Sequence, residues 1–291
     1  MIVHSFRGRS VTRLLLLVAC ASVLPTSSAA ETGDAKTSKT SAGSDKAQVT
    51  RERLEVMTRH IESIVISSTD PAVPKRMQPK PLFRYDDETR GYVDGTVWRL
   101  GESGRPLAII TAELHPNYLG DGPRIVYDLL SFTGRRFTAT SADIPGWSPR
   151  GPAVIFKELP DAPEAATVAA KRLTQLKEQA RRFTGTQEVQ ETDKTFVHLR
   201  LLPREIERYS PGSDPSSDGA LFVFANGRNP ALLLAIETDG KAWQYGIGRL
   251  SMPSTLEMRL DDTVVWSEPR IPSSPGWREP YNASNSPAEF P

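Results

Sequence analysis

Blocks of apolar residues separated by short polar turns run from position 218 to position 250, and they predict three consecutive antiparallel strands. Two of the blocks, residues 220–225 and 231–236, contain only apolar residues, and a third strand is expected over residues 243–250. A strand that is apolar on both sides is covered on both faces. We therefore expect this meander to lie at the centre of the fold, between two covering layers.

Two other segments carry apolar residues at spacings of three and four, as on one face of an amphipathic helix. The two stripes are Leu54, Met57, Ile61 and Ile64, and then Leu173, Leu176, Ala180 and Phe183. They predict helices over residues 47–66 and 161–184. Asp161 has the chemistry of an N-cap for the second helix, and Gly185 has that of the residue past its end.

The pattern of the second half repeats that of the first half in the same order. Identities 124 positions apart are Pro79 and Pro203, Arg84-Tyr85 and Arg208-Tyr209, Asp94-Gly95 and Asp218-Gly219, Pro106 and Pro230, and Glu113 and Glu237. Trp147-Ser148 matches Trp266-Ser267 at a shift of 119, and Tyr127 matches Tyr245 at a shift of 118. We interpret this order as a tandem duplication of one unit, a helix followed by antiparallel strands.

The expected fold class is therefore α+β, a tandem duplication of a helix-plus-antiparallel-sheet unit. Residues 47–159 form the first repeat and residues 160–270 the second, and the two halves share one core around an approximate two-fold axis. Residues 31–46 lack an apolar cluster and are expected to be a disordered tether. Residues 271–291 are rich in Pro, Ser and Asn and are expected to be an irregular tail.

Residues 1–30 have the anatomy of a signal peptide, with three arginines, a short apolar stretch and small residues before position 31. Two processing routes remain open. One is cleavage after Ala30, and the other is acylation of Cys20, the only cysteine, in the lipobox-like sequence Leu-Val-Ala-Cys. Both routes predict an exported, periplasmic or cell-envelope protein, lipid-anchored through Cys20 in the second case. The apolar stretch is too short to span a bilayer, so we expect no transmembrane helix in the mature chain.

Composition excludes several classes of function. The net charge of +1 provides no basic face for nucleic acid. A single cysteine and four histidines without zinc-ligand spacing give no reason to expect a metal. The sequence has no phosphate-binding glycine loop, dinucleotide fingerprint or nucleophile elbow, so no cofactor is expected.

The candidate chemistry lies at the ends of two matched strands. Glu113 and Glu237 could meet near the two-fold axis as a carboxylate pair for acid–base work or for Ca²⁺. The alternative is that both are solvated residues at strand ends.

Residues 114–122 form the loop in which the two halves differ most, and function often lies on such loops. The catalytic candidates are Glu113 and His115, and the binding candidates are Asn117, Tyr118, Asp121 and Glu237. The alternative here is ordinary loop chemistry, because Pro, Asn, Asp and Gly are also turn residues. A pocket that joins Glu113 and His115 to an acid from elsewhere would favour an enzyme.

Two stretches, residues 90–95 with Trp98 and residues 224–230, are similar to exported proteins of planctomycete-type bacteria. This resemblance implies export and brings no activity or catalytic residue with it. We therefore expect an exported, non-catalytic binding or envelope-interaction protein whose partner is an envelope protein or a glycan. One alternative is a hydrolase or metal-assisted enzyme using Glu113, His115 and Tyr118. The other is a structural envelope lipoprotein held through Cys20.

Overall fold

The computed structural model describes residues 37–71, 73, 80–87, 91–190 and 195–291. The chain divides into two units, residues 1–43 and 44–291. Of the first unit, only the start of helix α1 (Thr37–Glu62) is described. The signal segment and Cys20 lie outside the described residues.

Two helices and sixteen strands make up the described part, and every strand pair is antiparallel. The five-stranded sheet has the order β16 (Tyr281–Pro287), β5 (Arg124–Ser131), β4 (Ala108–His115), β3 (Tyr92–Leu100) and β2 (Phe83–Asp87). The nine-stranded sheet has the order β15 (Thr263–Glu268), β14 (Leu256–Leu260), β8 (Phe183–Gln190), β9 (Thr195–Leu201), β11 (Asp218–Asn226), β12 (Asn229–Thr238), β13 (Trp243–Arg249) and β7 (Ile155–Glu158), with β10 (Glu207–Tyr209) also paired to β11. Strands β1 (Val65–Ser67) and β6 (Thr138–Thr140) form a small separate sheet, and α2 spans Ala169–Ala180.

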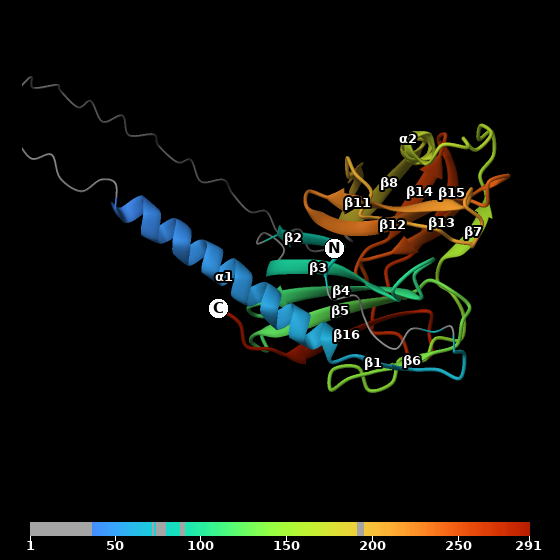
Figure 1. The fold of residues 1–291 in the computed structure, drawn as a ribbon. Coiled ribbons are helices and arrows are strands. Elements are labelled where there is room, and N and C mark those ends of the chain that lie inside the picture. Colours follow the sequence, from blue (N-terminus) through green and yellow to red (C-terminus); the bar gives the residue numbers. More distant parts are fainter. Residues whose placement is uncertain (1–36, 72, 74–79, 88–90, 191–194) are drawn as a thin grey trace, which may run out of the picture. The chain divides into compact units, whose positions relative to one another are not determined.

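The two large sheets face each other across a shared apolar layer, and each has a helix on its other face (Figure 1). Val97 and Ile109 from the five-stranded sheet pack in that layer with Val223 from the nine-stranded sheet. Met57 and Ile61 of α1 pack against Trp98, Ile110 and Leu129 on the outer face of the five-stranded sheet. On the other side, α2 covers the nine-stranded sheet through Leu176 and Ala180.

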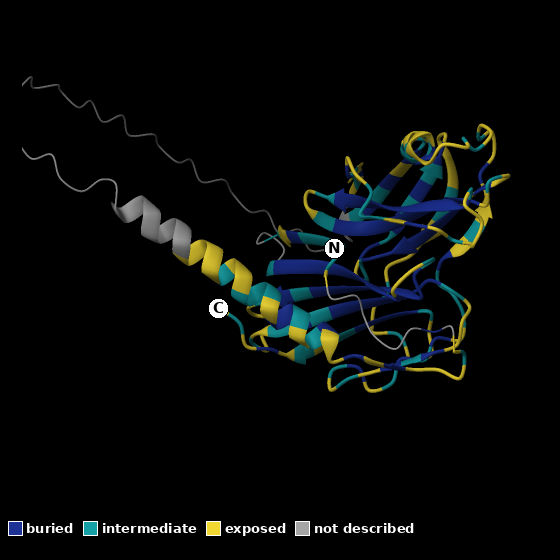
Figure 2. Cartoon of the chain, in the orientation of Figure 1, coloured by how far each residue is buried: buried dark blue, intermediate teal, exposed yellow. Residues whose placement is uncertain are grey.

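The meander expected over residues 218–250 is confirmed as β11, β12 and β13. Residues 218–225 of β11 and residues 230–238 of β12 are all buried, as strands covered on both faces must be. They appear as continuous dark bands in Figure 2. The hairpin across Asp261 and Asp262 joins β14 to β15, and both aspartates adopt positive φ (45° and 66°).

The expected α+β fold of two equal helix-plus-sheet repeats is wrong, because the protein is mostly β. The sheets have nine and five strands, and only two helices are described. The two halves of the chain also exchange edge strands. Strand β7, from the first half, pairs with β13, and β16, from the C-terminal tail, pairs with β5. The expectation of an irregular tail is therefore wrong, because the backbone of β16 completes the five-stranded sheet.

The helix expected over residues 161–184 is much shorter. It begins after Val168, which makes no side-chain cap, and it ends at Ala180. Phe183 and Gly185 were assigned to the helix end, but both lie in β8, where they pair with β14. Helix α1 differs in the opposite direction, since it begins at Thr37 within the expected tether and ends at Glu62.

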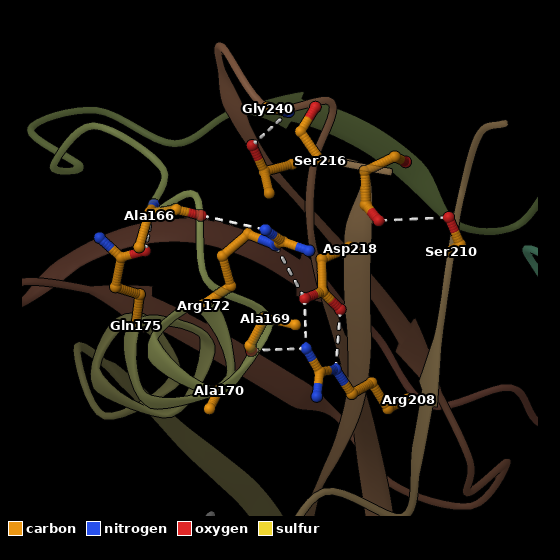
Figure 3. Close-up of polar contacts among 12 residues, drawn as sticks. Ala166, Ala169, Ala170, Arg172, Gln175, Arg208, Ser210, Ser216, Asp218 and Gly240 are labelled. Atoms are coloured by element: carbon orange, nitrogen blue, oxygen red, sulfur yellow. Dashed lines mark hydrogen bonds and ion pairs between the residues drawn. The ribbon is translucent and has the colours of Figure 1, made fainter. Parts of the chain in front are cut away.

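A carboxylate and an arginine tie each helix to its sheet at matched positions. Arg208 donates from Nε to Asp218 Oδ1 at 2.9 Å and from Nη2 to the carbonyl oxygen of Ala169 in α2 at 2.7 Å. Arg172 of α2 also donates to Asp218, at 3.1 Å, so that two arginines converge on one buried carboxylate (Figure 3).

The same arrangement recurs 124 residues earlier. There, Arg84 donates from Nε to Asp94 Oδ1 at 2.8 Å and also reaches the carbonyl oxygen of Thr50 in α1. These contacts explain why the Arg-Tyr and Asp-Gly dipeptides appear twice in the sequence.

Candidate functional site

A pocket of about 790 Å³ lies where the end of the five-stranded sheet meets residues of the nine-stranded sheet. Its wall from the five-stranded sheet and the following loop includes Glu113, His115, Tyr118, Asp128 and Ala283. Gln187, Asn229 and residues 250–254 form the opposite wall. Both acidic and aromatic side chains therefore line a space large enough for a small molecule.

The strand register places the two acids on one face of the sheet. Asp128 lies directly opposite Thr111, and Glu113 lies opposite Val126. Glu113 and Asp128 are thus diagonal neighbours on adjacent strands, a geometry in which side chains interact. Ala283, the neighbour of Asp128 on the other side, has a small side chain that leaves the space above Asp128 open.

Asp128 is buried and hydrogen-bonded. Tyr281 donates its hydroxyl proton to one carboxylate oxygen, and Thr111 donates to the other at 3.1 Å. Burial raises the pKa of Asp128 to about 7, and the charge of Glu113 acts in the same direction. The two hydrogen bonds and Arg249 oppose this rise in pKa without cancelling it.

Glu113 is held by two aromatic side chains. Tyr85 donates to Glu113 Oε1 at 2.9 Å, and His115 Nε2 lies 3.1 Å from Oε2. The His115 ring packs between two tyrosines, with ring centroids 5.5 Å from Tyr92 and 5.2 Å from Tyr118. Burial, followed by the charge of Glu113, raises the pKa of Tyr85, so that its hydroxyl stays a donor.

The structure brings together three of the residues predicted from sequence, namely Glu113, His115 and Tyr118. Asn117 uses its side-chain oxygen to accept from the backbone N–H of Gly122 at 3.3 Å, which closes the loop. Asp121 is exposed and lies 3.6 Å from Arg124. Neither Asn117 nor Asp121 is among the residues that line this pocket.

Glu113 and Glu237 do not form the expected carboxylate pair, because they lie in separate pockets. Glu237 lines a small pocket of about 160 Å³ and is bound by Arg105, whose Nε lies 2.9 Å from Oε1. Tyr209 donates to the same oxygen at 2.6 Å. The guanidinium carbon of Arg105 lies 4.2 Å from the centroid of the Phe156 ring. The charge of Glu237 is therefore balanced by Arg105, and the carboxylate has a structural role.

Sequence reasoning missed Asp128 and Tyr281. Asp128 is the only acid in the otherwise largely apolar strand of residues 125–132, and a lone acid in such a strand was the available signal. Tyr281 lies in the tail that was expected to be irregular, so nothing in the local pattern connected it to Asp128. Only the pairing of β16 with β5 brings the two side chains together.

No group of three metal-ligating side chains occurs among the residues that the structure describes. In the same part of the chain, no helix is long and apolar enough to cross a bilayer. No family model matches the chain, and no curated protein or solved structure matches it either. The resemblance to exported planctomycete-type proteins stays a prediction.

Proposed function

We propose that this chain is an exported, non-catalytic binding protein and that the pocket at Glu113 and Asp128 holds a small polar ligand. The observation that carries the proposal is the pocket itself, in which two carboxyl groups, a histidine and several amide and hydroxyl groups share one space with tyrosine rings and apolar side chains. Export rests on the anatomy of residues 1–30. An exported protein meets soluble molecules of the cell envelope, so we propose that the ligand is one of them.

The rigidity of the pocket wall supports binding. Each acid is oriented by hydrogen bonds from other strands, Glu113 by Tyr85 of β2 and Asp128 by Tyr281 of β16. Side chains fixed before the ligand arrives lose little conformational entropy on binding. The pocket is therefore organised for a ligand without further rearrangement.

The proposal can be tested by filling the pocket. An Ala283→Phe substitution would place a ring above Asp128, and Val264→Phe adds a ring at an exposed position of β15 as the matched control. Thermal-shift and ligand-observed NMR measurements would screen sugars, amino acids, amines and carboxylates against all three proteins. We expect at least one compound to bind the parent and the control but not Ala283→Phe. If every compound that binds does so equally to Ala283→Phe, the proposal is wrong.

A second function, acid–base hydrolysis, is favoured by one specific observation. The pocket joins Glu113 and His115 to Asp128, an acid from another strand whose pKa of about 7 suits a general acid near neutral pH. In that case, turnover of a hydrolysable compound should fall at least 100-fold in Asp128→Asn and stay unchanged in Glu257→Gln, a partly exposed glutamate of β14. Equal turnover in the parent and Asp128→Asn would exclude this role for Asp128.

A further inference from the structure

The same tyrosine–glutamate pair occurs twice in this protein, and in one of the two places it binds a cation. At the first site, Tyr85 donates to Glu113, and at the second, Tyr209 donates to Glu237. Glu237 also holds the guanidinium group of Arg105, which lies over the ring of Phe156. The second site is therefore a guanidinium-binding site that is filled by a residue of the chain itself.

Three of the matched positions that differ at the first site leave room or add a carboxyl group. A further difference is His115, whose ring contacts Glu113 Oε2 as Arg105 contacts Glu237 Oε2 at the second site. Asn229 stands 124 residues after Arg105, so an uncharged side chain replaces the guanidinium group. Ala283 replaces Phe156, because Ala283 pairs with Asp128 as Phe156 pairs with Gly246.

The third difference is Asp128 itself, which stands where the second site has Gly246 and which adds a second carboxyl group. The pocket volume is about 790 Å³ at the first site and about 160 Å³ at the second. The first site thus has the acceptors of a guanidinium site, an additional acid and an open volume in place of the internal cation.

We propose that the pocket at Glu113 binds a small molecule through a guanidinium group, which occupies the place that Arg105 occupies at Glu237. The inference rests on the proposed binding function and names its ligand class. A guanidinium group can donate two parallel hydrogen bonds to Glu113 and stack on an aromatic ring. Glu113 Oε2 already lies 3.1 Å from His115 Nε2, so the ligand would share this oxygen with the His115 ring. Tyr92, His115 and Tyr118 supply such rings in the pocket wall.

The charges around the pocket favour a cation. None of the described residues that line it is a lysine or an arginine. Arg249 is an arginine whose charge acts to lower the pKa of Asp128. Its guanidinium group donates to backbone carbonyl oxygens, among them those of Pro269 at 2.9 Å and Ser254 at 2.8 Å. A bound cation would therefore meet two carboxyl groups without a competing lysine or arginine in the described part of the wall.

Binding of a cation should also release a proton. Asp128 faces Glu113 on β4, Tyr281 on β16 and Arg249 at the end of β13, and its raised pKa leaves it largely protonated below pH 7. A positive charge nearby favours the ionised form and lowers that pKa. Proton release is thus a readout that distinguishes a cation on Asp128 from a ligand bound elsewhere.

The test compares two compounds of the same shape. Nα-acetyl-L-arginine amide carries a guanidinium group, and Nα-acetyl-L-citrulline amide carries an uncharged urea group in its place. Isothermal titration calorimetry at pH 6.5, in two buffers of different ionisation enthalpy, would measure affinity and proton release. We expect the arginine compound to bind the parent at least tenfold more tightly and to release a fraction of a proton per molecule bound.

Three variants test whether binding and proton release occur at this pocket. Glu113→Gln should weaken binding of the arginine compound at least tenfold, and Asp128→Asn should abolish proton release. Asn229→Arg should abolish binding, because it supplies the guanidinium group from within the chain, as Arg105 does at the other site. Melting temperatures identify any variant that fails to fold, and Asn229→Arg is expected to melt no lower than the parent.

The outcomes distinguish failure of the guanidinium inference from failure of the proposed binding function. If the citrulline compound binds as tightly as the arginine compound, the guanidinium inference is wrong. It is also wrong if neither compound binds while some other compound binds in a manner that Ala283→Phe abolishes, and the binding function then stands. If no compound binds in a manner that Ala283→Phe abolishes, both proposals fail.

Discussion

Asp128 and Asp218 are both buried carboxyl groups, but they have different partners. Asp218 accepts hydrogen bonds from two arginines and forms an ion pair with each of them. Asp128 is buried beside the acid Glu113, and these two effects favour its neutral form at a higher pH than usual, although its two hydroxyl donors act in the opposite direction. The same residue type therefore serves as a structural ion pair in one sheet and as a titratable group in the other.

The raised pKa of Asp128 has a consequence for stability. An aspartate in the unfolded chain has a pKa of about 3.9, whereas in the folded protein that of Asp128 is about 7. Between these values the folded state holds a proton that the unfolded state has lost, so stability from this group is present below about pH 4 and is lost as pH rises to about 7. The loss should approach about 4 kcal/mol.

Urea unfolding of the parent and Asp128→Asn at several pH values would measure this difference. We expect the parent to lose stability relative to the variant between pH 4 and pH 7 and the difference to level off above pH 7. Parallel stability curves for the two proteins would contradict the raised pKa.

Asp218 leads to a prediction of a different kind. Replacing it with Asn would leave Arg172, a buried residue, and Arg208 without their anion. Loss of one partner from a buried charge cluster costs about 3–5 kcal/mol. The matched substitution Asp94→Asn affects one arginine, Arg84, which is partly exposed, and should cost less. Urea unfolding at pH 7 gives both values, and an equal loss for the two variants would be the contrary result.

At the scale of elements, packing decided which assignments from sequence were correct. Strands β11 and β12 were predictable because both of their faces are buried, which makes the runs apolar throughout. Strand β16 was not predictable, because its Ser and Asn residues and the nearby prolines resemble a loop in sequence, and its strand conformation comes from pairing with β5. The end of α2 was misplaced for a related reason. Phe183 continues the helical spacing, but its ring contributes to the sheet core from β8.

The candidate site, too, was predictable only where local sequence was sufficient. Glu113 and His115 were predictable because they end a recognisable strand near a divergent loop. Asp128 and Ala283 join them only through strand register, and register between distant segments is not written in local sequence. The wall formed by Gln187 and Asn229 depends on how the two sheets meet, which is a property of the whole core.

Helix α1 should be held to its sheet mainly by apolar contacts. Ile61 is fully buried against the five-stranded sheet, so Ile61→Ala should reduce the free energy of unfolding by about 2–5 kcal/mol. Arg59, an exposed residue of the same helix, is the control, and Arg59→Ala should change stability by about 0.5 kcal/mol or less. Chemical denaturation measures both changes, and a similar small effect for both would mean that α1 contributes little to the core.

For the whole molecule, the exchange of β7 and β16 makes the two halves depend on each other. Strand β16 pairs with β5 along seven residues and supplies the buried side chains Tyr281 and Ala283 to the core and the pocket. Neither half of the chain can therefore complete its sheet alone. The prediction of two repeats that share a core did not anticipate that they would also share strands.

Removal of residues 271–291 should therefore destabilise the entire fold rather than release a tail. The truncation exposes the edge of β5, and an unpaired edge strand promotes aggregation. We expect the melting temperature to fall by at least 10 °C, or the protein to aggregate, and a synthetic peptide of residues 271–291 to restore part of the loss by strand addition. A truncated protein that melts like the parent would show that β16 is dispensable.

Strand β16 follows all the other described strands in sequence, so it is synthesised after them. Ribosomes make the chain from the N-terminus, so β2 to β5 exist for some time before the strand that closes their sheet has been made. Asp128 gains its tyrosine partner, and the pocket gains the part of its wall that contains Ala283, only when Tyr281–Pro287 has emerged. A product that stops before this segment would have no completed pocket, so ligand binding would report that translation had passed residue 287.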